Sequence, residues 1–93
     1  MIVSILRIPV AEGLRFETVL ILRSARRAIL AQPGCRDYIV FEQQAPESAV
    51  VLVEAWASPE DFEAHIASEE HCHILSAVRL SGCASEAFCG SHG

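Results

Sequence analysis

With 93 residues, the chain has room for one domain with a modest hydrophobic core. Its formal net charge of −5 argues against nucleic-acid binding, and its longest apolar run, residues 49–57, contains Glu54 and is too short to cross a membrane. The N-terminus lacks the pattern of a signal peptide, so we expect a cytoplasmic protein. The hydrophobic fraction of 52% is high for so small a chain, which indicates that apolar residues also cover a subunit interface.

A strand and a long helix are predicted for the first third of the chain. Residues 2–8 are apolar and β-branched and stop at Pro9, which is typical of a strand. Residues 12–31 predict a helix. One apolar face of this helix would hold Leu14, Ile21, Ala25, Ala28 and Ile29. A second apolar group lies on or near the opposite face: Phe16, Val19, Leu20 and Leu30. Either that group meets a partner, or the helix boundary differs by a few residues.

Two further strands and a second helical region follow the turn at Pro33-Gly34, which ends the first helix. Residues 36–44 and 49–57 predict strands joined by a short loop. In the strand at residues 49–57, one face of the sheet would hold Val50, Leu52, Glu54 and Trp56. The segment Ser58-Pro59-Glu60-Asp61 is typical of a helix start. The helix restarts at residues 68–70 and runs to about residue 80, and residues 83–89 predict a short last strand before a frayed end.

The predicted order of elements, β-α-β-β-α-β, is that of an α+β, ferredoxin-like fold in a single domain over residues 1–93. Such a sheet carries helices on one face and leaves the other face bare. The strand at residues 49–57 is apolar on both sides, so its bare side needs a cover. We therefore expect a homodimer in which two sheets meet face to face.

The cysteines and histidines show no standard metal pattern. The four cysteines stand at irregular intervals: Cys35, Cys72, Cys83 and Cys89. Without a signal peptide, we expect them to be free thiols. His71 and His73 are two residues apart on a predicted helix and point about 200° away from each other, so they cannot readily share one ion. The C-terminal cysteines and His92 fit no zinc spacing. We expect no bound metal.

Several short motifs, in this order, resemble the antibiotic biosynthesis monooxygenase family. They are Pro33-Gly34-Cys35-x-x-Tyr38, Glu54-x-Trp56, Ser58-x-Glu60 and Ala64-His65. The resemblance implies ferredoxin-like monomers that pair into a dimeric α+β barrel. It also implies a small aromatic substrate, since known members include cofactor-free monooxygenases of phenols and quinols. A haem-degrading branch of the family uses an asparagine in its first strand, and this chain has no asparagine.

Glu54, His65, Trp56 and Tyr38 are the candidates for a site between the predicted sheet and helices. A carboxylate on a buried strand, such as Glu54, must be paired, hydrogen-bonded or protonated. An imidazole titrates near neutral pH, which suits His65 to the role of general base. Trp56 and Tyr38 would bind the substrate as pocket walls, with the Tyr38 hydroxyl donating into the cavity. The structural alternatives are a Glu54 tied to His65 or to an arginine, a packing histidine, and ordinary core aromatic residues.

Two hypotheses of function follow. The first is a cofactor-independent monooxygenase in which His65 removes a phenolic proton and Glu54 orients His65, with no flavin, haem or metal cofactor. The electron-rich anion would then reduce oxygen itself inside a dry, apolar pocket. The second is a non-enzymatic dimer on the same scaffold, binding a small ligand or serving in a stress response. Polar groups that converge on an open cavity favour the enzyme, whereas a filled cavity favours the second hypothesis.

Overall fold

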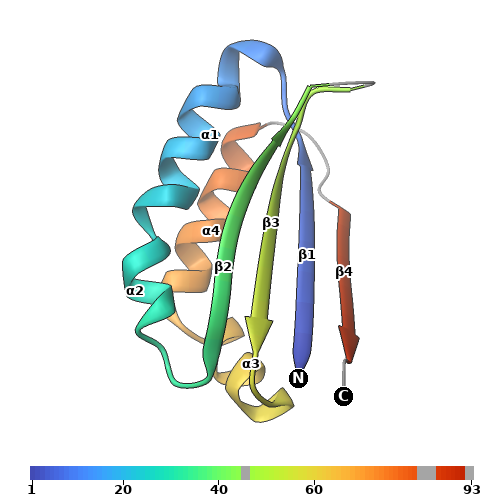
Figure 1. Cartoon of the computed structure of the whole chain (residues 1–93). Coiled ribbons are helices and arrows are strands. Elements are labelled where there is room, and N and C mark those ends of the chain that lie inside the picture. The colour runs from blue at the N-terminus through green and yellow to red at the C-terminus, as the bar shows by residue number, and fades with distance from the viewer. Residues whose placement is uncertain (45–46, 82–85, 92–93) are drawn as a thin grey trace.

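The computed structural model describes residues 1–44, 47–81 and 86–91, and it confirms the predicted α+β, ferredoxin-like architecture (Figure 1). The strands β1 (Ile2–Pro9), β2 (Cys35–Gln43), β3 (Ala49–Trp56) and β4 (Glu86–Ser91) form one antiparallel sheet in the order β2-β3-β1-β4. The helices are α1 (Glu12–Ser24), α2 (Arg26–Leu30), α3 (Pro59–Ile66) and α4 (Glu69–Ser81). Helices α1, α2 and α4 lie against one face of the sheet (Figure 1). Within the described part of the chain, no helix covers the other face.

The alternation predicted for β3 is confirmed and places the candidate carboxylate on the helix-covered face. Leu52, Glu54 and Trp56 are buried, whereas the residues between them are partly exposed. The strand register sets Glu54 opposite Tyr38 on β2 and opposite Ser4 on β1. These three residues therefore form one row across the sheet.

The single helix predicted over residues 12–31 is wrong, because the helix is interrupted at Ala25 between α1 and α2. The Ser24 hydroxyl donates to the Ile21 carbonyl at 2.7 Å, a local bond that competes with regular helical bonding. The predicted faces also need correction. Val19 belongs to the core and Ala28 is exposed, whereas Phe16 and Leu20 are exposed as expected.

The turn before β2 and the start of α3 are built as one unit. Gly34 has a φ of 79°, a conformation that glycine adopts without steric cost. A Cβ at that position would overlap the Asp61 carboxylate, so the close approach of the two segments also requires glycine. Ser58 caps α3 as predicted, because its hydroxyl accepts from the Asp61 amide at 3.2 Å. The Ala57 amide donates to the Gly34 carbonyl at 2.8 Å, which holds the turn against the end of β3.

The described residues test only part of the predictions for the cysteines. Cys35 and Cys72 are free thiols, as expected. Cys83 and the side chain of Cys89 lie outside what the structure describes, as does part of the strand predicted at residues 83–89. No helix in the described ranges is long and apolar enough to cross a membrane.

Candidate functional site

A buried carboxylate and a buried histidine meet between the sheet and α3. Glu54 on β3 is 4% exposed and His65 on α3 is 1% exposed. His65 Nε2 lies 3.1 Å from Glu54 Oε2, which is within ion-pair distance, although the two groups are not aligned as a hydrogen bond. The structure therefore brings together the two residues predicted to carry the chemistry. Their catalytic roles stay a prediction.

The other nitrogen of His65 is held by a chain of hydrogen bonds. His65 Nδ1 lies 2.6 Å from Gln32 Oε1, and the Gln32 amide nitrogen donates to Glu70 Oε2 at 3.1 Å. Because an ionised carboxylate only accepts hydrogen bonds, Glu70 turns the amide nitrogen of Gln32 towards itself and the amide oxygen towards His65. An amide oxygen also only accepts, so His65 Nδ1 must carry a hydrogen.

The contact with Glu54 is made by the other ring nitrogen. A neutral His65 with its hydrogen on Nδ1 presents the lone pair of Nε2 to the Glu54 carboxylate, and two acceptors 3.1 Å apart repel each other unless a proton lies between them. The Glu54–His65 contact is therefore sensitive to where the hydrogen of the imidazole lies.

Aromatic rings enclose His65 on two sides. Trp56, which is fully buried, stacks on the imidazole with ring centroids 4.5 Å apart and an interplanar angle of 25°. His71 on α4 meets it edge-on at 5.2 Å and 75°. Burial lowers the pKa of His71, His65 lowers it further, and Glu54 acts in the opposite direction. The neutral form of His71 is therefore favoured beside the Glu54–His65 pair.

Four buried polar atoms in this cluster have no hydrogen-bond partner among the described residues: Glu54 Oε2, Trp56 Nε1, His65 Nε2 and His71 Nδ1. Most buried polar atoms in proteins are hydrogen-bonded, so a concentration of unsatisfied ones around one histidine is unusual. Such a cluster is costly for stability and is typical of a site that serves a ligand or a reaction.

Tyr38 lies beside this cluster, but its hydroxyl is used elsewhere. The hydroxyl donates to the Leu22 carbonyl of α1 at 2.5 Å, and the residue is fully buried. Burial raises the pKa of Tyr38 well above its ordinary value, and the negative charge of Glu54 adds to the effect. Burial likewise raises the pKa of the Cys35 thiol, with Glu54 contributing, so this thiol stays protonated at neutral pH.

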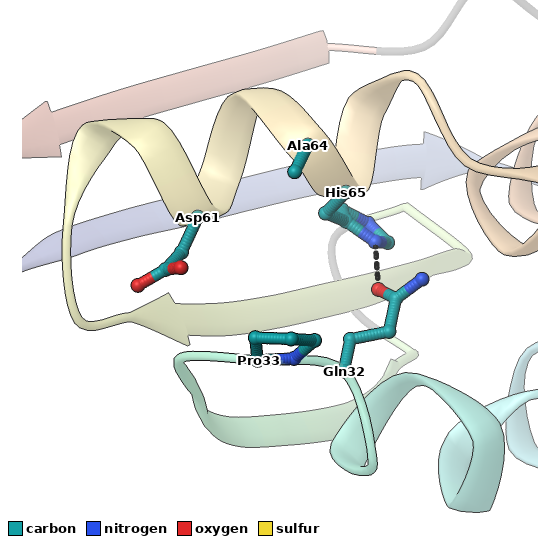
Figure 2. Close-up of a pocket in the computed structure, with 5 residues that line it drawn as sticks. All are labelled: Gln32, Pro33, Asp61, Ala64 and His65. Atoms are coloured by element: carbon teal, nitrogen blue, oxygen red, sulfur yellow. Dashed lines mark hydrogen bonds between the residues drawn. The ribbon is translucent and has the colours of Figure 1, made fainter.

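A small cleft reaches His65 from the side of the Gly34 turn. It has a volume of about 120 Å³, and it is lined by Gln32, Pro33, Asp61, Ala64 and His65. Figure 2 shows α3 on one side of the cleft and the turn before β2 on the other, with Asp61 and His65 at opposite ends. Glu54, Trp56 and Tyr38 do not line this cleft. Of the four predicted site residues, His65 therefore lines the cleft, with its side chain buried, and the other three lie behind it.

Sequence reasoning missed Gln32, Glu70 and the role of His71 as a neighbour of His65. The position of Gln32 directly before the Pro33-Gly34 turn was the available signal for it. His71 and His73 do diverge as predicted, since His73 Nε2 lies 3.5 Å from the Ser24 hydroxyl on α1. Among the described residues, no group of three or more histidine, cysteine, aspartate or glutamate side chains is arranged to hold a metal ion.

The protein is thus a ferredoxin-like α+β domain with a small cleft between the turn before β2 and α3. The sequence profile of the antibiotic biosynthesis monooxygenases matches residues 1–76. The chain therefore belongs to the antibiotic biosynthesis monooxygenase family, as its motifs suggested. No protein of curated function matches the sequence.

Solved structures of low sequence identity share the fold. A protein from Deinococcus radiodurans named for the same family is 16% identical and has a TM-score of 0.88, with 100% of this chain and 93% of that chain covered. A similarly named protein from Nitrosomonas europaea is 16% identical with a TM-score of 0.86, covering 99% and 98%. SnoaB, a cofactor-independent oxygenase from Streptomyces nogalater, is 15% identical with a TM-score of 0.81, covering 98% and 91%.

Proposed function

We propose that this protein is a cofactor-independent monooxygenase of electron-rich phenols or quinols, with His65 as the general base. The observation that carries the proposal is the buried Glu54–His65 pair at the end of a cleft, among polar atoms that lack partners in the described part of the chain. Membership of the monooxygenase family supports it. The name of SnoaB indicates that oxygenase chemistry without a cofactor occurs on this fold.

The reaction needs few groups from the protein. His65 takes the proton of a ring hydroxyl, and the resulting anion gives electrons to O₂ to form a carbon–oxygen bond at a ring carbon that carries hydrogen. The hydroperoxide then takes up the proton held by His65. Loss of water, with the ring hydrogen, leaves a new carbonyl on the ring. One oxygen atom of O₂ enters the product and the other leaves as water.

The cleft limits the size of the substrate. Its volume of about 120 Å³ is close to that of an engineered apolar cavity of roughly 150 Å³ that holds benzene. One aromatic ring therefore fits beside His65, and a fused polycyclic system does not fit within the cleft. Pro33 and Ala64 supply apolar walls, while Gln32 and Asp61 supply hydrogen-bonding groups for ring hydroxyls.

Each candidate residue has a distinct part in this proposal. His65 is the residue that touches the substrate. Glu54 lies behind it and stabilises the imidazolium that forms when the substrate loses its proton. Trp56 holds the plane of the imidazole by stacking, and Tyr38 supports the apolar wall behind Glu54 without presenting its hydroxyl to the ligand.

Oxygen uptake with a panel of single-ring phenols and quinols tests the proposal. We expect uptake above the rate of autoxidation without added flavin, haem or metal. His65→Ala should lower turnover by roughly 10²–10⁴-fold, the loss typical for a general base. His73→Ala is the matched control, because His73 is an exposed histidine that lies against α1. Uptake that never exceeds autoxidation, or equal turnover in His65→Ala protein that is shown to be folded, would contradict the proposal.

One observation favours the second candidate, a non-enzymatic ligand-binding protein. Trp56 and Tyr38 are fully buried and do not line the cleft, so the space behind His65 is filled. This candidate predicts that a single-ring phenol protects the protein against thermal unfolding while oxygen uptake stays at the rate of autoxidation.

A further inference from the structure

We propose that Gln32 is a positioning residue that sets the pH at which His65 becomes a base. This inference rests on the proposed function. Gln32 keeps Nδ1 of His65 protonated until a substrate hydroxyl replaces the Gln32 amide at that nitrogen. The juxtaposition that carries it is the chain from Glu70 through Gln32 to His65, which ends at the cleft.

The first step of the argument is the orientation of the amide. Gln32 lies in the turn before β2, and Glu70 lies in the first turn of α4. Their contact of 3.1 Å directs the amide nitrogen of Gln32 to the carboxylate, so the amide oxygen is left for His65. If the amide rotated, its oxygen would face the Glu70 carboxylate and two acceptors would meet. Glu70 therefore locks the orientation of Gln32.

The second step concerns the ring nitrogen of His65 that contacts Gln32. Gln32 and His65 both line the cleft, and Nδ1 is the ring nitrogen that contacts Gln32 (Figure 2). The other nitrogen, Nε2, faces the buried Glu54. A base must present a lone pair to the hydroxyl that it deprotonates, so Nδ1 has to lose its hydrogen before it can act. The 2.6 Å contact with Gln32 Oε1 opposes that loss, because it stabilises the N–H form.

Titratable groups surround His65 from β2, β3, α4 and its own helix, α3. The charged or titratable groups near it are Glu54 on β3, Tyr38 and Cys35 on β2, His71 and Glu70 on α4, and Asp61 on α3 itself. Among these, Glu54 contacts Nε2 at 3.1 Å. Gln32 is the uncharged group at Nδ1, so its replacement by a neutral residue removes the hydrogen bond at that nitrogen without adding or removing a charge.

Two substitutions of opposite effect test the inference. Gln32→Leu keeps the approximate size but removes the acceptor, so the pH midpoint of the His65 imidazole should fall by about 1 pH unit, a tenfold loss of proton affinity. Gln32→Glu places a carboxylate at Nδ1, so the midpoint should rise by a similar amount. Glu70→Gln unlocks the amide of Gln32 and should lower the midpoint by a smaller amount.

The readout is the NMR titration of the His65 ring signals in the ligand-free protein, assigned by their loss in His65→Ala. Gln44→Leu is the control, since it makes the same chemical change at an exposed glutamine outside the cluster, and it should leave the midpoint in place. Opposite shifts in Gln32→Leu and Gln32→Glu support the inference. Midpoints within about 0.3 pH units of the wild type in both variants, or shifts of the same sign, overturn it.

The same variants separate this inference from the proposed function. If turnover exists, the acid limb of its pH profile should move with the NMR midpoint, to lower pH in Gln32→Leu and to higher pH in Gln32→Glu. A merely structural role of Gln32 would lower turnover in both variants without moving the limb in opposite directions, and that result would overturn the inference. If the His65 midpoint shifts in opposite directions in the two variants but no oxygen uptake is seen, the role of Gln32 is supported and the proposed oxygenase function is contradicted.

Discussion

Tyr38 illustrates how a single hydroxyl connects the sheet to the helices behind the candidate site. Its bond of 2.5 Å to the Leu22 carbonyl joins β2 to α1, and the strand register pairs Tyr38 directly with Glu54. Tyr38→Phe removes the hydroxyl and leaves a buried carbonyl without this donor. We expect the free energy of unfolding at neutral pH to fall by about 1–3 kcal/mol, which urea denaturation would measure.

The raised pKa of Tyr38 adds a pH dependence to this prediction. In the unfolded chain a tyrosine ionises near pH 10, whereas burial keeps the folded Tyr38 protonated above that pH. Between the pKa of tyrosine in the unfolded chain and its higher pKa in the folded protein, the unfolded state binds fewer protons than the folded state. The contribution of Tyr38 to stability is therefore fully present below about pH 10 and declines as pH rises. Tyr38→Phe should flatten this alkaline decline. An unchanged alkaline slope in the variant, measured by urea denaturation from about pH 8 to 11, would show that Tyr38 is not its source.

At the scale of secondary-structure elements, the fit of the Gly34 turn against α3 holds His65 and Gln32 at one cleft. Gly34→Ala would force a side chain into a φ of 79° and drive its Cβ into the Asp61 carboxylate. We expect a loss of about 1–3 kcal/mol in the free energy of unfolding, because the strained backbone and the clash with Asp61 act together. Chemical denaturation at neutral pH measures this loss.

Gly13→Ala is the matched control for the Gly34 substitution. Gly13 lies in α1 with nothing within 4 Å of the position of its added Cβ, and alanine favours the helix more than glycine does. Its stability should therefore stay the same or rise slightly. If both alanine substitutions proved equally mild, the turn and α3 would not form the rigid unit that the structure indicates.

The elements that sequence reasoning predicted well are those with a strong local signal. Alternation along β3 put Glu54 and Trp56 on one face, and the Ser58 cap put His65 two turns into α3. The interruption at Ala25 and the burial of Val19 carried no such signal, since the Ser24 bond and the packing of α1 on the sheet decide them. Gln32 was not predicted as a site residue for a related reason. Its partners, His65 and Glu70, lie 33 and 38 positions away along the chain, and only the folded turn brings them together.

At the scale of the whole molecule, the face of the sheet opposite the helices is largely apolar, although the strand register also places Arg7 and Asp37 on it. Its apolar side chains are partly exposed in the single chain: Val3, Ile5, Ile39, Phe41, Val51 and Val53. A monomeric soluble protein rarely exposes so continuous an apolar patch. The expected homodimer, in which a second copy covers this face to form a dimeric α+β barrel, therefore stays our prediction for the assembly.

A charge substitution on this face tests the predicted dimer. Val53→Glu would place a carboxylate between Ile5 and Ile39, its cross-strand neighbours, and would bury it unpaired between two sheets. The cost of several kcal/mol is one that a dimer interface cannot readily offset. We expect sedimentation velocity to show a dimer for the wild type and a monomer or unfolded chain for this variant. Ala28→Glu, which adds the same charge at an exposed position of α2, should remain dimeric. A wild-type chain that sediments as a stable monomer at micromolar concentration would show that the bare face serves another purpose, and the barrel would have to be abandoned.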